Sequence, residues 1–214
     1  MNIDDWRARW ESGQTGFHEA SANALLVEHA RVFDGRRRVL VPLCGKALDL
    51  AFLRGRGLDV VGVEGVEQAA RGFFSDAGVA PEERVDGATR WLSSGGGAIG
   101  VADFFTVELA RCDAAYDRGA LVAIDPALRG RYVEKVRSLL EPSATILIVS
   151  FGYDQAQMAG PPFSLDEADV HALFDAHGVV SRLATRDALA DNPRFRERGA
   201  TSIVESVFRV ELSA

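Results

Sequence analysis

The order of patterns in residues 39–64 constrains the fold more than any other feature of the chain. Residues 39–43 and 58–64 are short apolar runs that each predict a buried strand. Between them, Gly45 predicts a turn, residues 46–56 follow a helical period, and Gly57 provides the stop that ends many helices. Two strands joined in this way form a parallel βαβ unit.

The rest of the chain continues this alternation. Further strands are expected from Ile99 to Asp103 and at residues 113–116 and 144–151, and helices at residues 132–140 and 166–176. Apolar and charged residues alternate over 208–212, which indicates a strand with one more polar face that pairs antiparallel with residues 179–183. The pattern predicts an α/β fold with a doubly wound, mostly parallel sheet and helices on both faces. The glycine run Gly95–Gly97 is expected to be a flexible surface loop.

Composition excludes several classes of protein. With 24 basic and 31 acidic residues the net charge is −7, which argues against a general binder of nucleic acid or anionic membranes. No apolar run approaches the roughly 20 residues of a membrane helix, and residues 1–6 do not begin a signal peptide. Cys44 and Cys112 are the only cysteines and form no metal-ligand spacing, which suits a reducing compartment. We therefore expect a cytoplasmic protein without a metal, a nucleic-acid partner or a membrane anchor.

The βαβ unit has the parts of a nucleotide-type site. Ligands of doubly wound sheets bind beyond the carboxyl ends of the strands, where the strand order reverses. Gly45 lets the backbone come close to a ligand, and a helix opening near Lys46 would offer unpaired N–H groups. Glu64 ends the second strand, where a carboxylate can accept both hydrogen bonds of a ribose diol. The alternative for Glu64 is an exposed carboxylate without a ligand.

The glycine content of this unit narrows the choice of cofactor. A dinucleotide fingerprint has three glycines, whereas residues 43–49 contain only Gly45. This favours a cofactor without phosphates, S-adenosylmethionine, over the nicotinamide dinucleotide of an oxidoreductase. Two alternatives stay open from the residues alone: an NAD-type oxidoreductase, and a binding module without catalytic activity.

Longer motifs occur in order along nearly the whole chain. They are Trp6-x-x-x-Trp10, Thr15-Gly16-Phe17-His18, Val41-Pro42-Leu43-Cys44-Gly45-Lys46-Ala47-Leu48-Asp49, Val61-Gly62-Val63-Glu64, Asp103-Phe104-Phe105, Tyr116-Asp117-Arg118-Gly119-Ala120-Leu121, Gly160-Pro161-Pro162-Phe163 and Asn192-Pro193-Arg194-Phe195-Arg196. Together they resemble the thiopurine S-methyltransferase family. The chain departs from the family at residues 65–67, where the family usually has a hydroxyl-bearing residue soon after the ribose acid.

The resemblance implies a fold and a cofactor. The fold would be that of a Rossmann-like class I methyltransferase, with a seven-stranded sheet, five parallel strands and a reversed C-terminal hairpin. Residues 1–214 would form one domain, in which residues 1–34 cover the cofactor and residues 36–214 form the Rossmann-like core. The cofactor would be S-adenosylmethionine.

The resemblance also implies cofactor contacts, each of which has a structural alternative. Trp10 would belong to the lid, or would pack with Trp6 on one helical face. Leu43 would contact the cofactor or belong to the core, and Asp103 would accept from adenine or cap the next turn. Phe104 would stack on adenine or pack in the core. With the residues discussed above and below, the implied cofactor contacts are Trp10, Leu43, Gly45, Glu64, Asp103, Phe104 and Arg118.

The acceptor side is assigned from the same motifs. Arg118 follows the fourth strand, where a guanidinium can attract an anion and lower the pKa of a thiol, unless it forms a salt bridge with Asp117. Phe17 matches a family residue between the cofactor and acceptor pockets, and Phe163 would form an aromatic wall of the acceptor pocket. His18 is either a general base or a structural residue, because a thiolate needs little help to react.

These features predict an S-adenosylmethionine-dependent S-methyltransferase. The acceptor would be a small or aromatic, heterocyclic thiol of the thiopurine type, or a related selenium or tellurium compound, methylated by direct in-line displacement. Another small soft nucleophile, such as a halide or thiocyanate, is the alternative acceptor. The enzyme is expected to be a monomer, and Arg118 is the residue expected to assist the reaction.

Overall fold

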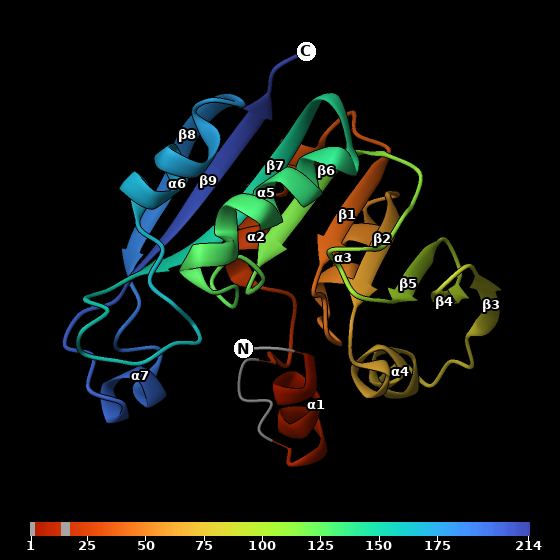
Figure 1. Cartoon of the computed structure of the whole chain (residues 1–214), viewed down its shortest axis with the longest axis horizontal. Helices are drawn as coiled ribbons and strands as arrows, with labels where there is room; N and C mark the ends of the chain where they lie inside the picture. Colours follow the sequence, from red (N-terminus) through yellow and green to blue (C-terminus); the bar gives the residue numbers. More distant parts are fainter. Residues whose placement is uncertain (1–2, 14–17) are drawn as a thin grey trace.

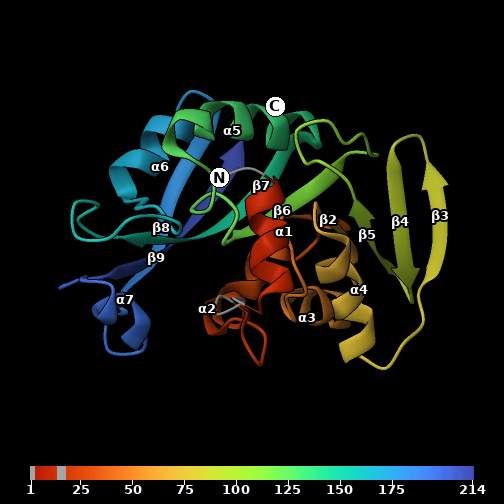
Figure 2. The same cartoon turned by 60° about the horizontal axis from the view of Figure 1, so that its bottom comes forward.

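A nine-stranded sheet runs through the middle of the molecule, between two layers of helices (Figures 1 and 2). The computed structural model describes residues 3–13 and 18–214. The strand order is β3-β4-β5-β2-β1-β6-β7-β9-β8. The strands are β1 (Arg38–Pro42), β2 (Asp59–Glu64), β3 (Glu82–Asp86), β4 (Thr89–Ser94), β5 (Gly97–Val101), β6 (Cys112–Arg118), β7 (Leu140–Gly152), β8 (Gly178–Asp187) and β9 (Val204–Leu212).

The helices are short and cover the sheet on both sides. One face of the sheet packs against α2, α3 and α4, and the other face packs against α5 and α6. Helices α1 and α7 lie near the carboxyl ends of the parallel strands (Figures 1 and 2). None in the described part of the chain has the length and apolar character that crossing a membrane requires. The helices are α1 (Ile3–Glu11), α2 (Ala24–His29), η1 (Ala30–Phe33), α3 (Asp49–Gly55), α4 (Glu67–Asp76), η2 (Pro126–Leu128), α5 (Arg129–Ser138), α6 (Glu167–Phe174) and α7 (Pro193–Glu197).

The parallel part of the sheet reverses its winding beside β1. Strands β5, β2, β1, β6 and β7 are parallel, and β1 lies between β2 and β6. The chain therefore winds from β1 outward through β2 to β5, and then crosses to the other side of β1 to form β6. Because β1 has helices over both faces, its residues are nearly all buried, which explains its unbroken apolar run. The reversal leaves a crevice at the carboxyl ends of β1 and β6.

The predicted fold class is confirmed. The βαβ unit, the later parallel strands and the helices over both faces occur where the sequence pattern placed them, and β9 pairs antiparallel with both β7 and β8. The helix expected to open at Lys46 begins later, at Asp49, because residues 43–48 pass through a series of turns. The C-terminal pair is also longer than the alternation over residues 208–212 indicated.

The sheet has two more strands than the seven that were expected. Strands β3 and β4 pair antiparallel with each other, and β4 pairs with β5. The glycine run is not a free loop, because Gly95 and Gly96 form the two-residue turn between β4 and β5. Both have positive φ, 51° and 85°, which such a hairpin turn favours. Strand β3 escaped sequence analysis because all five of its residues are exposed, so it lacks an apolar alternation.

Candidate active site

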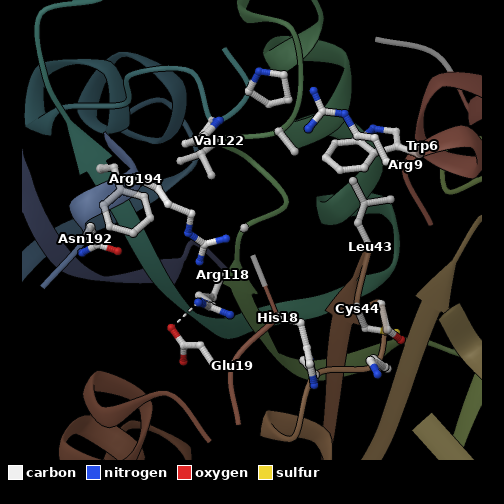
Figure 3. A pocket seen from close by; sticks show the side chains of 18 of the residues that line it. Trp6, Arg9, His18, Glu19, Leu43, Cys44, Arg118, Val122, Asn192 and Arg194 are labelled. Atoms are coloured by element: carbon white, nitrogen blue, oxygen red, sulfur yellow. Dashed lines mark hydrogen bonds and ion pairs between the residues drawn. The ribbon is translucent and has the colours of Figure 1, made fainter. Parts of the chain in front are cut away.

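A cavity of about 660 Å³ opens in the crevice where the strand order reverses (Figure 3). Its volume lies within the roughly 300–1,000 Å³ that is typical of sites for small molecules and cofactors. The turn after β1, the end of β2 and helix α1 line one side. The start of the segment after β6, the prolines after β7 and the residues around α7 line the other. In Figure 3, Leu43 and Trp6 lie across the cavity from Asn192 and Arg194, with Arg118 between them.

The turn after β1 forms the floor of the first side. Leu43 and Gly45 both have left-handed backbone conformations, with φ of 46° and 54°. This region costs a residue with a side chain roughly 1–2 kcal/mol, so Leu43 is a strained position beside the cavity. A Cβ on Gly45 would lie 3.2 Å from the ring of Trp10, so glycine suits this position on both counts. Leu43 and Gly45 both line the cavity, and their contact with the cofactor stays a prediction.

Glu64 closes the end of β2 and is only 7% exposed. Its carboxylate accepts from the backbone N–H of Gly45 at 2.8 Å and from that of Val66 at 2.7 Å. Burial raises the pKa of Glu64, and the backbone N–H groups counteract that shift. A carboxylate has about four lone-pair sites, so Glu64 can still accept from a ribose hydroxyl beside its backbone partners. The residues at this end of the cavity therefore fit S-adenosylmethionine.

Helix α1 lies near the carboxyl ends of the parallel strands (Figure 2), and four of its side chains line this end of the cavity. Trp10 is buried and packs with Val66 and Ala69 in a small apolar cluster, separate from the two large core clusters of the sheet. Ile3 covers Gly65 so closely that a Cβ there would lie 2.3 Å from its side chain. Helix α1 is thus attached to the cofactor end of the cavity through a small contact.

Deleting residues 1–17 is expected to leave a folded sheet that binds the cofactor poorly. The reason is that the apolar contacts of α1 lie in the small cluster around Trp10 and at Ile3 over Gly65, and not in the two large core clusters. The temperature of unfolding should fall by less than about 5 °C, while calorimetry should show loss of affinity for S-adenosylmethionine. Collapse of thermal stability would show that the segment is structural and would contradict its assignment as a lid.

Arg118 lies in the middle of the cavity and pairs with the carboxylate of Glu19 (Figure 3). The alternative partner, Asp117, points to the opposite face of β6, because neighbouring residues of a strand alternate. There the buried Asp117 accepts from the hydroxyl of Tyr132 at 2.6 Å and from the backbone N–H of Leu121 at 3.0 Å. The alternative salt bridge between Arg118 and Asp117 is therefore not formed, and Arg118 pairs with Glu19 instead.

Asp103 and Phe104 lie outside the residues that line the cavity. The carboxylate of Asp103 accepts from the backbone N–H of Phe105 at 2.9 Å, as the capping alternative requires. Phe104 is 2% exposed, and its ring centre lies 5.2 Å from that of Tyr132. Because its ring is held in the core beside α5, Phe104 follows the core alternative here. Contact of either residue with adenine stays a prediction.

Phe17 and Phe163, which sequence analysis assigned to the acceptor pocket, are not among the described residues that line the cavity. Phe17 lies outside the described residues. Pro161 and Pro162 line the cavity, but Phe163 is half-buried and packs over Gly160, where a Cβ would lie 2.2 Å from its ring. The two prolines thus contribute to the lining of the cavity, whereas the aromatic wall at Phe163 stays a prediction.

His18 lines the cavity close to the turn after β1. Its pKa is lowered, first by burial and then by the positive charge of Lys46. The imidazole is therefore neutral at pH 7 and able to accept a proton, so both interpretations of His18 stay open.

Sequence analysis missed the part of the site that comes from the C-terminal third. Arg186 and Glu205 line the cavity and form an ion pair at 2.6 Å between β8 and β9. Asn192, Arg194 and Arg198 line it from α7 and its flanks, and Arg198 donates to the carbonyl of Pro161 at 3.3 Å. The signal was present in residues 192–196, a motif to which no role was assigned.

Known proteins match the chain over nearly its whole length. The profile of the family described as thiopurine S-methyltransferase matches residues 1–213. A thiopurine S-methyltransferase of Xanthomonas campestris pv. campestris (strain 8004) is 44% identical over 216 residues, which cover 99% of each chain. One of Pseudomonas fluorescens (strain Pf0-1) is 39% identical over 215 residues, which cover 98% of this chain and 99% of that relative.

Solved structures support the fold. The 1,6-didemethyltoxoflavin-N1-methyltransferase of Burkholderia thailandensis, with bound 1,6-didemethyltoxoflavin and S-adenosylhomocysteine, is similar with a TM-score of 0.65 and 19% identity. The match covers 98% of this chain and 87% of that one. A SAM-dependent methyltransferase of Methanosarcina mazei has a TM-score of 0.63 at 16% identity, over 91% of this chain and 100% of that one. The chain belongs to the thiopurine S-methyltransferase family, whose methyl donor is S-adenosylmethionine.

Proposed function

We propose that this enzyme transfers a methyl group to a small thiol, held as its thiolate at the Arg118 side of the cavity. Thiols of aromatic or heterocyclic compounds, such as thiopurines, are the proposed acceptors, together with related selenium and tellurium compounds. The observation that carries the proposal is the arrangement of one cavity between a buried carboxylate, Glu64, and a guanidinium, Arg118. The first suits a ribose and the second an anionic acceptor.

The protein contributes binding and alignment. When bound, S-adenosylmethionine supplies an electrophilic methyl group on a sulfonium. A thiolate aligned opposite the sulfonium would bond to the methyl carbon as the bond from that carbon to the sulfonium sulfur breaks, and S-adenosylhomocysteine would leave. Glu64 and the turn at Gly45 would hold the ribose, and Trp10 would cover it. The residues of the opposite wall, Pro161 and Pro162 among them, would exclude water and hold the acceptor in line, so that two reactants meet in one orientation.

Ionisation of the acceptor needs little from the protein. A thiolate is already a strong nucleophile, and the charge of Arg118 favours that form of a nearby thiol. Cys44 also lines the cavity, but burial raises its pKa well above the ordinary value of 9.0, with a further contribution from Glu64. Cys44 therefore stays a thiol, which supports direct transfer over a relay through an enzyme nucleophile.

The proposal extends to the domain organisation, the cellular location and the oligomeric state of the enzyme. We place residues 1–214 in one domain, with residues 1–34 forming the segment over the cofactor. The enzyme is proposed to work in the cytoplasm as a monomer on small molecules. The net charge of −7 supports small acceptors over nucleic acid.

The test is release of S-adenosylhomocysteine against a panel of acceptors. The panel contains aromatic and aliphatic thiols, halides, thiocyanate, and oxyanions of selenium and tellurium. Turnover of thiols supports the proposal, and turnover of halides or thiocyanate alone would move the assignment to that alternative. Ultraviolet difference spectra with NADH test the oxidoreductase alternative, and we expect no binding.

The rate is expected to rise with pH through the pKa of each free thiol tested and to level off above it. The reason is that the thiolate is the reacting form and that a thiol ionises in this pH range without a base from the protein. Rates measured at saturating cofactor, with thiols of different pKa, test this. Efficient methylation of a catechol or an amine, with thiols inert, would send the assignment to another class of methyltransferase.

A further inference from the structure

A chain of polar contacts connects Arg118 to the first residue of α3. The guanidinium of Arg118 pairs with the carboxylate of Glu19. The side-chain amide of Asn23 donates to Glu19 at 3.4 Å, and the backbone N–H of Asn23 donates to the carboxylate of Asp49 at 2.7 Å. The contacts thus run from the cavity into the core beside α2 and α3.

The inner end of this chain is rigid. Asn23 and Asp49 are each only 3% exposed. The side-chain oxygen of Asn23 also accepts from the N–H groups of Leu25 and Leu26, at 3.0 and 3.3 Å, which fixes Asn23 at the start of α2. Asn23 is therefore held by both its backbone and its side chain, and it provides a fixed support for Glu19.

The outer end depends on Glu19. The side chain of Arg118 is 17% exposed and that of Glu19 is 40% exposed. Tyr116 lies two residues before Arg118 on the same face of β6, and its buried hydroxyl interacts with the carboxylate of Asp49 at the inner end of the chain. Among the described residues, Glu19 is the only carboxylate that pairs with Arg118. Without it the guanidinium would lose this ion pair, and the attraction of the more distant Asp49 would remain.

We propose that Glu19 is a positioning residue, which holds the guanidinium of Arg118 toward the acceptor from the fixed support of Asn23 and Asp49. This inference rests on the proposed function, because it assigns to Glu19 the orientation of a group that recognises an anionic acceptor. A displacement of about 1 Å at such a group is enough to lower the rate substantially. Glu19 itself acts only through Arg118.

The experiment is a double-mutant cycle of Glu19→Ala and Arg118→Ala, with Glu19→Gln as the conservative variant. For an anionic thiol, kcat/KM should fall about tenfold in Glu19→Ala, and for a neutral thiol less than about threefold. Glu19→Gln should recover activity to within about threefold, since its amide oxygen still accepts from the guanidinium. The double variant should be no slower than Arg118→Ala alone. Glu28→Ala, which removes an exposed carboxylate of α2 outside the cavity lining, is the matched control and should behave as wild type.

A second readout does not depend on activity. The side-chain Nε–H signal of Arg118, assigned by its loss in Arg118→Ala, should report an immobile guanidinium in the wild type and a mobile one in Glu19→Ala. Additive effects in the cycle, or an Nε–H signal that Glu19→Ala leaves unchanged, would overturn the positioning role. Failure of the wild type to methylate any thiol would instead overturn the proposed function, and the signal would still decide the role of Glu19.

Discussion

Replacing Glu64 by alanine is expected to weaken binding of S-adenosylmethionine by about 2 kcal/mol or more, which is about thirtyfold in Kd. The variant loses the charge-assisted hydrogen bonds from the ribose. It also leaves the N–H groups of Gly45 and Val66 without their acceptor, so the turn that approaches the cofactor is no longer held in place. Titration calorimetry with S-adenosylmethionine measures the loss.

Two further variants separate the ribose contact from general damage. Glu64→Gln keeps the volume and one acceptor oxygen, so its affinity should lie between those of the wild type and Glu64→Ala. Glu67→Ala removes a half-exposed carboxylate three residues away. Glu67 pairs with Arg71 and Arg90 outside the cavity, so this variant should bind S-adenosylmethionine normally. Unchanged affinity in a folded Glu64→Ala protein would contradict the ribose assignment.

Replacing Asp117 by alanine is expected to lower the free energy of unfolding by about 3 kcal/mol. Asp117 is 5% exposed, and its removal leaves the hydroxyl of Tyr132 and the N–H of Leu121 buried without an acceptor. Urea unfolding measures the loss. Asp117→Asn should lose less than about 1 kcal/mol, because the amide oxygen still accepts from Leu121 and the tyrosine hydroxyl can turn to accept from the amide. Equal losses in both variants would contradict this account.

The same pair of proteins tests the charge of Asp117. Burial raises the pKa of Asp117 above its ordinary value of 3.8. At a pH between the unfolded and the folded pKa, the folded protein therefore keeps a proton that the unfolded chain has released. The contribution of this group to stability is present below the unfolded pKa and is lost as the pH rises through the folded pKa. Asp117→Asn lacks this contribution, so its stability should fall less steeply over that range. Identical pH slopes would show that the carboxyl titrates normally.

The elements that could be predicted from sequence are those with a burial pattern of their own. The run at residues 39–43 is apolar because β1 is covered on both faces, and Glu64 was found because it stands at the end of such a strand. Strand β3 has no buried face and left no pattern. The left-handed conformation of Leu43 is set by its surroundings, since leucine has no preference for it.

Within the site, sequence analysis could not predict which residues far apart in the chain pair with each other. Arg118 and Glu19 are 99 residues apart, and no local spacing links them. Sequence analysis therefore offered the neighbouring Asp117 as the partner, although the alternation along β6 separates the two side chains. Local order fixes which face a residue takes, whereas the partner across a cavity depends on how the whole chain folds.

The β3–β4 hairpin determines which strand forms the edge of the sheet beyond β5. Without it, β5 would present an open row of backbone N–H and C=O groups to any other extended chain, which is the usual starting point of strand-by-strand aggregation. The hairpin transfers that open edge to β3, where Glu82, Glu83, Arg84 and Asp86 are exposed. Adding a second copy to this edge would bring rows of charge together and strip them of water. The two strands outside the expected sheet thus place a largely charged strand at this edge, where pairing with a further extended chain is disfavoured.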